Sequence, residues 1–427
     1  WKVEPDGKSF RLQLRKGVKF HGDYGNVTAK DFIFALEQVK LTDSLHGEAP
    51  YFKSTVDSAE AVNDNEIIFH LNRPDGQFVT MVSEQAGGVE AQSKANFDKT
   101  GPATWKTGPL AGSGPYQFVE AAENQYVRYK RIEGTHPWRN MPAFNEFEWR
   151  YAKEPSTRLA ALLSNEAHMA PLPDDLMVTA EKQGGMKTLR ATFPGNRIFG
   201  NFLCCYLKDP KDPDSGAYFP NAPMMDKRVR QALNKAIDRD ELNKAFFSGE
   251  GQPMFLTHQD ANRLGWNPDW EKRFKGEYGY DPEGAKKLLA EAGQTNLTIT
   301  MQVLAVAGVG VSSSDLLETI GAYWRKIGVN TVIDQTDAPT VQNARRERKY
   351  SNNFTVSATG SDIWSGYGVW NSPSLHLGVE DPEVEKLIAQ LKLTIDEKKQ
   401  DELWRQVGER SFSQFQNLIL FWLPVKV

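Results

Sequence analysis

The chain has 427 residues, about three times the length of a typical domain, so we expect it to form at least two domains. Its 51 basic and 55 acidic residues give a net charge of −4, which excludes the bulk positive field that nucleic-acid binding requires. Apolar residues make up 40% and charged residues 25%, values typical of a globular protein. The longest apolar stretches, residues 301–311 and 418–425, are too short to span a bilayer.

The first predicted strand lies within residues 8–20, where Phe10, Leu12 and Leu14 alternate with polar residues. Thr28 then precedes an acidic residue by three positions, and apolar residues recur after it at helical spacing. This pattern predicts that Thr28 caps an amphipathic helix. Residues 66–71 form the next predicted strand.

Two polar stretches divide the rest of the chain. The turn-rich residues 108–116 precede strands predicted on either side of Arg128 and around residues 144–151. The proline-bearing residues 208–223 precede a region of helices. We expect both stretches to be boundaries or crossings between lobes.

The most informative unit follows. A strand is predicted at residues 297–306, a helix at 314–327 and a strand at 329–333, which is a βαβ crossover with parallel strands. A helix at 340–349 and a strand at 354–358 repeat the pattern. The sequence therefore predicts an α/β lobe with helices on the faces of its sheet.

Ligands of such lobes bind outside the carboxyl ends of the strands, which points to the loops at residues 307–313 and 359–374. The second loop combines one carboxylate with exposed rings, a set that suits a cationic or amine-bearing ligand. The residues concerned are Asp362, Trp364, Tyr367 and Trp370. The alternative, that these rings fill the core of their own loop, has about equal weight.

No pattern indicates catalysis or a cofactor. The seven histidines are scattered, and the chain has no GxSxG, HExxH or phosphate-binding loop, so neither a metal nor another cofactor is expected. The basic run Arg345, Arg346 and Arg348 is typical of a solvated helix face. The adjacent Cys204 and Cys205 bridge only with strain, so they are interpreted as small buried residues rather than a redox pair.

Several segments resemble one known family, the extracytoplasmic solute-binding proteins of ABC importers in the dipeptide and oligopeptide class. DGKSFRLQLRKGVKFHGD followed by VTAKDFIFALEQV is similar to the opening signature of that family, and GSGPYQFVE to its GTGPY turn. MDKRVRQALNKAIDRDELNKAFFSGEGQPM and YDPEGAKKLLAEAG are similar to two further family segments. The resemblance covers nearly the whole chain, in one order.

The resemblance implies a periplasmic-binding-protein-like α/β fold, with two lobes of mixed sheets around a ligand cleft and a small extra subdomain. It assigns residues 1–107 to the subdomain, 108–222 to part of the first large lobe, 223–411 to the second, and 412–427 to a return to the first. It also implies that the chain is short at both ends relative to the family.

The resemblance also nominates ligand-binding residues. Asp362, with Gly360 before it, stands where peptide binders carry an aspartate that pairs with the peptide amine, although no Trp follows Gly360 directly. Arg345 falls near a family arginine that meets a carboxylate, and the segment NRIFGNF nominates Phe199 and Asn201.

The expected function is therefore a monomeric receptor outside the cytoplasmic membrane that delivers a peptide or similar solute to an ABC permease and catalyses nothing. The alternative cargo is an opine, an oligosaccharide or a nickel chelate, bound in the same fold. A hydrolase and an interaction module for a sensor kinase or chemoreceptor are the rival classes. Whether the protein carries a lipid anchor is left open.

Overall fold

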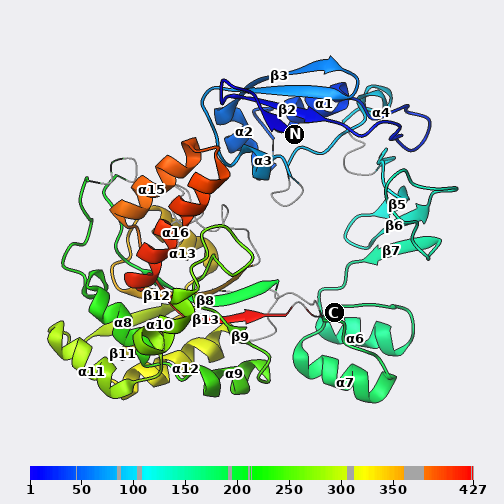
Figure 1. Cartoon of the computed structure of the whole chain (residues 1–427). Helices are drawn as coiled ribbons and strands as arrows, with labels where there is room; N and C mark the ends of the chain where they lie inside the picture. The colour runs from blue at the N-terminus through cyan, green and yellow to red at the C-terminus, as the bar shows by residue number, and fades with distance from the viewer. Residues whose placement is uncertain are drawn as a thin grey trace. The chain divides into compact units, whose positions relative to one another are not determined.

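The computed structural model describes residues 1–44, 46–83, 88–102, 108–190, 195–209, 212, 214–304, 312–359, 379–424 and 426. The chain divides into two compact units, which are described separately (Figure 1). Unit 1 comprises residues 1–154 and 392–395, and unit 2 comprises residues 155–391 and 396–427.

Unit 1 contains two antiparallel sheets and four short helices among the described residues. One sheet has the strand order β1-β2-β4-β3 and the other the order β5-β6-β7. The core of the first sheet includes Phe10, Phe69 and Phe78, with ring centroids 4.7 Å apart for Phe10 and Phe78. The elements are β1 (Lys2–Val3), β2 (Ser9–Gln13), α1 (Ala29–Val39), α2 (Ala49–Thr55), β3 (Val56–Asn63), β4 (Glu66–Leu71), α3 (Phe78–Met81), α4 (Lys94–Thr100), β5 (Tyr116–Ala122), β6 (Tyr126–Arg131) and β7 (Glu146–Arg150).

The start of α1 confirms the predicted cap at Thr28. One carboxylate oxygen of Asp31 accepts hydrogen bonds from the Thr28 amide at 2.9 Å and from the Thr28 hydroxyl at 2.8 Å. Its other oxygen accepts from the amide of Lys94 at 3.2 Å, which ties α1 to the start of α4. Asp31 is buried, so the cap is also a tertiary contact.

We expect Asp31→Ala to lower the free energy of unfolding by about 1–3 kcal/mol, because it leaves partly buried donors without an acceptor. Asp98→Ala is the matched control, since the carboxylate of Asp98 is exposed and pairs across the helix surface with Lys94. Its change should stay within about 0.5 kcal/mol of zero. Urea denaturation followed by circular dichroism measures both, and equal losses would contradict a buried cap.

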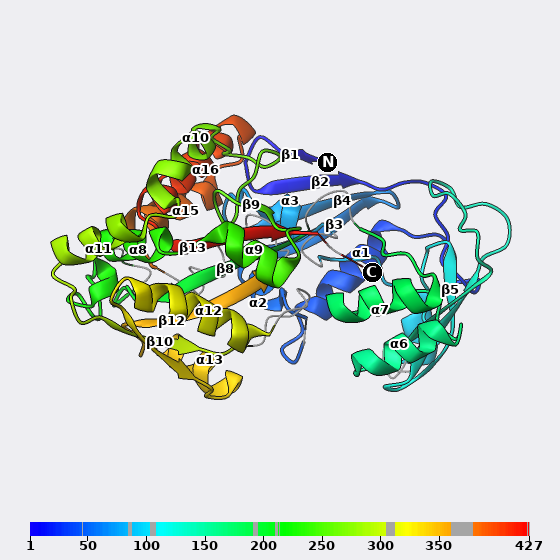
Figure 2. The ribbon, with the colours of Figure 1, turned by 90° about the horizontal axis from the view of Figure 1, so that it is seen from below.

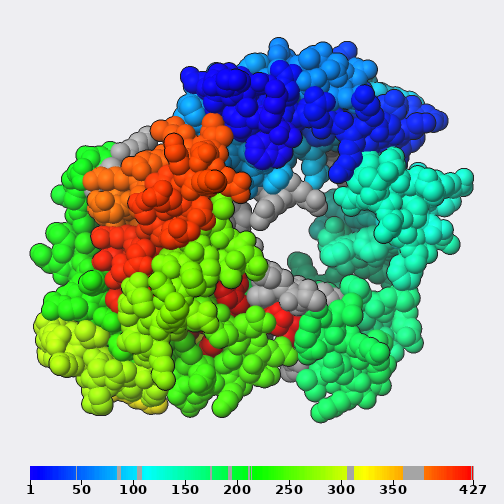
Figure 3. Space-filling view, viewed as in Figure 1, coloured from blue at the N-terminus to red at the C-terminus, as the bar shows by residue number. Residues whose placement is uncertain are grey.

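Unit 2 is built on one six-stranded sheet with the order β11-β10-β12-β8-β13-β9. Its elements are α6 (Pro155–Leu163), α7 (Asp174–Gly184), β8 (Asn196–Leu203), a short 3-10 helix (Pro223–Met225), α8 (Lys227–Lys235), α9 (Arg239–Phe247), β9 (Gln252–Pro253), α10 (Asp269–Tyr278), α11 (Pro282–Glu291), β10 (Thr298–Gln302), α12 (Ser313–Lys326), β11 (Asn330–Asp334), α13 (Ala338–Arg346), β12 (Asn353–Thr359), α15 (Pro382–Leu393), α16 (Glu397–Ser413) and β13 (Asn417–Leu423). Figure 3 shows α15 and α16, in orange and red, at the surface of this unit.

The predicted βαβ crossover is confirmed. Strands β10 and β11 are parallel, and α12 connects them. Helix α11 begins after Asp281, whose side chain accepts from the amide of Gly284 at 2.9 Å, as the predicted cap requires. The repeat through α13 and β12 is also present, with β12 parallel to β10.

The C-terminal strand β13 pairs antiparallel with β8, and the two lie side by side in Figure 2. The end of the chain therefore returns to the segment before residue 222. Both strands belong to the same sheet as β10, β11 and β12, which the sequence analysis placed in the second large lobe.

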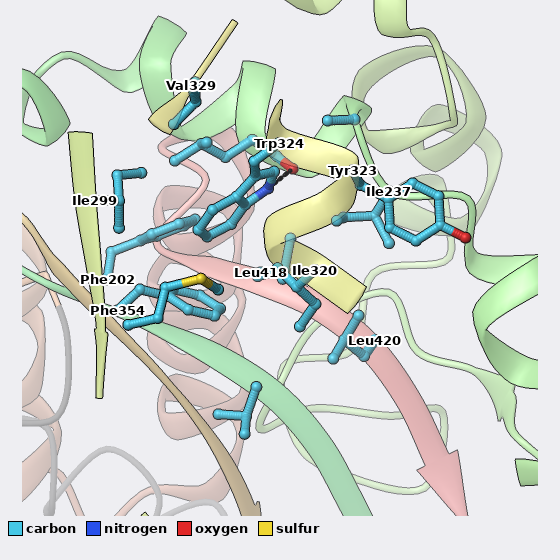
Figure 4. Close-up of a cluster of buried hydrophobic side chains, with 14 of the residues drawn as sticks. Phe202, Ile237, Ile299, Ile320, Tyr323, Trp324, Val329, Phe354, Leu418 and Leu420 are labelled. Carbon is cyan, nitrogen blue, oxygen red and sulfur yellow. Dashed lines mark hydrogen bonds between the residues drawn. The ribbon is translucent and has the colours of Figure 1, made fainter. Parts of the chain in front are cut away.

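One face of the sheet packs against helices to form the largest core. Trp324 of α12 lies over Phe354, with ring centroids 4.7 Å apart, and its indole N–H donates to the carbonyl of Leu233 at 3.0 Å (Figure 4). Phe202 of β8 and Leu418 of β13 pack in the same core. This face is almost wholly apolar, so the polar residues of the same strands point to the opposite face.

The bonding of the two cysteines differs from the prediction. Cys204 and Cys205 follow β8 directly and are buried, as predicted, but their sulfurs are joined in a disulfide. The sequence predicts ordinary small core residues here, because neighbouring cysteines seldom have the geometry to pair. The structure corrects that interpretation.

Candidate functional site

The carboxyl ends of four strands lie at one edge of the unit 2 sheet. Strands β10, β11 and β12 are parallel, while β8 is antiparallel to both β12 and β13, so β13 runs in the same direction as β12. Strand β8 therefore begins at this edge, where Arg197 is the register partner of both Thr359 and Trp422. Because ligands of α/β sheets bind outside such an edge, it is the candidate site.

Arg197 is the most unusual residue of this edge. It is fully buried, and its guanidinium carbon lies 6.0 Å from the ring centroid of Phe199 and 5.8 Å from that of Trp422. Stacking on aromatic faces partly offsets the cost of burying the charge. Arg197 was not predicted, although a basic residue within the mostly apolar strand NRIFGNFL was the available signal.

Phe199 and Asn201 share one face of β8, two residues apart, as strand periodicity requires. On this face Phe199 belongs to a second buried apolar cluster that includes Ile419 and Trp422 of β13. The side-chain amide of Asn201 donates to the hydroxyl of Ser357 at 2.7 Å, and its oxygen accepts from the amide of Asn417 at 3.2 Å. Asn201 thus bridges β12, β8 and β13. Both nominated residues are buried within unit 2, and their contact with a solute stays a prediction.

His258 packs edge-on against Phe199, with ring centroids 5.9 Å apart. Burial holds the pKa of His258 well below its ordinary value of 6.5, and the charges of Arg197 and Arg263 lower that pKa further. The imidazole is therefore neutral in the folded protein at neutral pH. A second cation beside Arg197 would be strongly disfavoured in this buried region.

This burial predicts a loss of stability in acid. The pKa of His258 is lower in the folded state than in the unfolded chain, so its contribution is complete above about pH 6.5 and falls as the unfolded chain takes up the proton. We expect His258→Gln to flatten the pH dependence of the unfolding free energy below pH 6.5 by up to about 1.4 kcal/mol per pH unit. Urea denaturation at pH 7.5, 6.5 and 5.5 measures the slopes.

The control for this prediction is His168→Gln, because His168 is exposed. That variant should keep the slope of the unchanged protein. A His258→Gln slope equal to that of the unchanged protein would show that burial does not perturb the histidine.

Arg345 lies elsewhere in unit 2. It is buried at the end of α13 beside Tyr206 and Tyr350, and burial lowers its pKa to about 10. Tyr206 follows the last residues of β8, whereas Arg197 stands at the start of that strand, and eight strand residues span about 23 Å. The structure therefore brings Phe199 and Asn201 together but separates Arg345 from them.

The expectation of a solvated basic face is wrong for two of the three arginines. Arg345 is 1% exposed, and the side chain of Arg348 forms a 3.1 Å ion pair with the buried carboxylate of Glu380. Only Arg346 is exposed. The cause is tertiary packing, since Arg345 is buried beside Tyr206, which follows β8, and Arg348 pairs with Glu380.

The remaining nominated residues lie outside the described part of the chain: Gly360, Asp362, Trp364, Tyr367 and Trp370. The described part of β12 ends at Thr359, at the candidate edge.

Two other observations concern a cavity and metal ligands in the described part of the chain. A cavity of about 100 Å³ between α6 and α7, lined by Met169, Met177 and Met186 among others, is smaller than the roughly 300 Å³ of ordinary small-molecule pockets. Within the described ranges, no three His, Cys, Asp or Glu residues come together to hold a metal ion.

Comparisons with known proteins identify the family. Residues 1–375 match the family described as bacterial extracellular solute-binding proteins, family 5 Middle. The chain is 27% identical over 352 residues to the dipeptide-binding protein of Escherichia coli K12, covering 78% of this chain and 61% of that protein. It is also 27% identical over 366 residues to heme-binding protein A of Haemophilus influenzae, covering 78% of this chain and 60% of that protein.

A solved structure gives the fold. The ABC transporter substrate-binding protein CtaP of Listeria monocytogenes superposes with a TM-score of 0.74 at 18% identity, over 100% of this chain and 83% of that one. This likeness confirms the predicted periplasmic-binding-protein-like α/β fold.

Among the described residues, no helix is long and apolar enough to cross a membrane. The chain spans about three fifths of the length of the curated relatives named above, and its family match covers most of its own residues. The chain belongs to the bacterial extracellular solute-binding proteins of family 5.

Proposed function

We propose that this chain belongs to the solute-binding receptor of an ABC importer, which captures a peptide or similar small organic solute outside the cytoplasmic membrane and delivers it to a membrane permease. The observation that carries the proposal is the family match over residues 1–375. A relative named for dipeptide binding supports peptide cargo, and one named for haem binding keeps other cargo open. The receptor acts as a monomer and catalyses no reaction.

The proposed site combines the carboxyl edge of the unit 2 sheet with the nominated loop. Asp362 would pair with a solute amine, and Trp364, Tyr367 and Trp370 would supply aromatic surfaces. Phe199 and Asn201 would shape the site from β8, since their contacts with Arg197 and Ser357 hold that strand in place. Arg345 remains the proposed partner of a solute carboxylate, although in the described residues it packs at the other end of β8.

Binding would involve closure of lobes by a hinge. The sequence placed a lobe boundary at residues 208–223, with residues 108–222 and 412–427 in one lobe, 223–411 in the other and 1–107 as a subdomain. Because β8 and β13 share one hydrogen-bonded sheet with β10, β11 and β12, residues 196–203 and 417–423 move together with that second lobe. Residues 112–114 are therefore the proposed hinge segment. If small-angle scattering showed no compaction on adding a confirmed solute, the hinge would be excluded.

The function is tested by denaturing the purified full-length protein and identifying released small molecules by mass spectrometry. A mixture of short peptides is the expected result. One non-peptide compound would retain the receptor and reject peptide cargo. If the protein instead converted added peptides to amino acids, the hydrolase would replace the receptor.

A further inference from the structure

The disulfide between Cys204 and Cys205 lies at the end of β8, away from the candidate edge. Cys204 is fully buried and Cys205 is 3% exposed. The two sulfurs lie 3.8 and 3.4 Å from the carbonyl oxygen of Met224. The pair is therefore enclosed by unit 2, where solvent reaches it only when the structure opens locally.

The backbone at this disulfide is held in an uncommon conformation. Cys205 has φ +63°, the left-handed region that residues other than Gly, Asn and Asp seldom adopt. Such a residue persists where its surroundings over-determine it. Here the disulfide closes a small ring with the peptide between the two cysteines, and that ring restricts the backbone of Cys205 directly.

This conformation directs two backbone groups at one buried carboxylate residue. The carbonyl of Cys205 accepts from the amide of Glu380 at 3.2 Å. The amide of Leu207 donates to one carboxylate oxygen of Glu380 at 2.6 Å. The other oxygen pairs with Arg348 at 3.1 Å, and the side chain of Glu380 is 1% exposed.

These contacts connect three separate segments: the turn after β8, the residues that lead into α15, and the end of α13. Their arrangement depends on where the turn places the Cys205 carbonyl and the Leu207 amide. A change in the backbone of Cys205 would move both groups and leave a buried carboxylate with fewer donors, which is unfavourable.

We propose that Cys204 and Cys205 form a redox site. Their disulfide holds the segment after β8 in its hydrogen bonds to Glu380, an arrangement called the clamp below. When a dithiol reduces the disulfide, the clamp is released. In that reaction the dithiol forms its own disulfide, and its two electrons and two protons convert the cysteines to thiols. The ring then opens, Cys205 can leave the left-handed region, and the bonds to Glu380 weaken. The sulfur of Cys205 is already within reach of the Met224 carbonyl, which provides an acceptor for the new thiol.

The test compares the thermal unfolding of the full-length protein before and after dithiothreitol. Alkylation and intact mass confirm that two thiols appear only after reduction. We expect reduction to lower the melting temperature by about 2 °C, because the disulfide closes a very short loop in a large protein. The C204S/C205S variant is the matched control: it should melt near the reduced protein and not respond to dithiothreitol.

The Glu380→Gln variant distinguishes a loss of stability that acts through Glu380 from a general effect of breaking the cross-link. If the clamp acts through this carboxylate, reduction should shift the melting temperature of Glu380→Gln by less than half as much, because the coupled partner has been changed. An undiminished shift in that variant would overturn the proposal, as would two free thiols without reductant or no shift in the unchanged protein.

Hydrogen exchange provides a readout that needs no variant. The amides of Leu207 and Glu380 should exchange faster in the reduced protein than in the oxidised one. Amides of the central strand residues of β12 serve as the internal reference and should change less. Equal protection of Leu207 and Glu380 in both redox states would overturn the proposal even if a variant failed to fold.

Discussion

Replacing Phe354 by Ala is expected to lower the free energy of unfolding of unit 2 by about 3–5 kcal/mol. The ring is fully buried between Trp324 and Phe202, whose ring centroids lie 4.7 and 5.7 Å away. It also fills space over Gly200, where a Cβ would lie 2.2 Å from the Phe354 ring. Because the neighbouring rings belong to different elements, they close only part of the cavity that truncation leaves.

Urea denaturation measures this loss, and Phe144→Ala is the control. Phe144 is 75% exposed, so its truncation should change the unfolding free energy by no more than about 0.5 kcal/mol. A Phe354→Ala protein within about 1 kcal/mol of the unchanged protein would show that this face of the sheet is not the principal core.

Replacing Asp362 by Ala is expected to weaken the binding of a peptide with a free amino terminus by about 2–5 kcal/mol, roughly 30- to 4,000-fold in Kd. This prediction depends on the family resemblance at Asp362 and on the proposed function. Its physical reason is that removing one partner leaves the solute ammonium desolvated and unpaired. Isothermal titration calorimetry with a peptide identified from the released cargo measures the change.

Two controls identify the interaction. Asp240→Ala removes an exposed carboxylate on α9 and should leave the Kd unchanged. An N-acetylated peptide should bind weakly to the unchanged protein and lose little further affinity in Asp362→Ala. If Asp362→Ala bound the free peptide as tightly as the unchanged protein, amine recognition by this residue would be rejected.

The local elements could be predicted because their signals lie within a few residues. The cap of α1 at Thr28, the cap of α11 at Asp281 and the parallel pair around α12 all follow from periodicity and capping chemistry. These features depend on short-range geometry, which neighbouring residues determine with little help from the rest of the chain.

The candidate site was predicted only in part. The rule for α/β sheets placed it at the carboxyl ends of the strands, and Phe199 and Asn201 do share one face near that edge. The rule could not reveal Arg197, because its burial between Phe199 and Trp422 depends on the pairing of β8 with a strand more than 200 residues later.

The sequence by itself therefore determined the fold class, the alternation of strands and helices in residues 297–359, and the family resemblance. Only the tertiary structure decided that β8 lies between β12 and β13, that Arg345 packs at the far end of β8, and that Cys204 and Cys205 are joined beside Glu380. The physical reason is the range of the interactions: helix and strand periods are set over a few residues, whereas register, burial of a charge and contact with Glu380 depend on packing between segments distant in the chain.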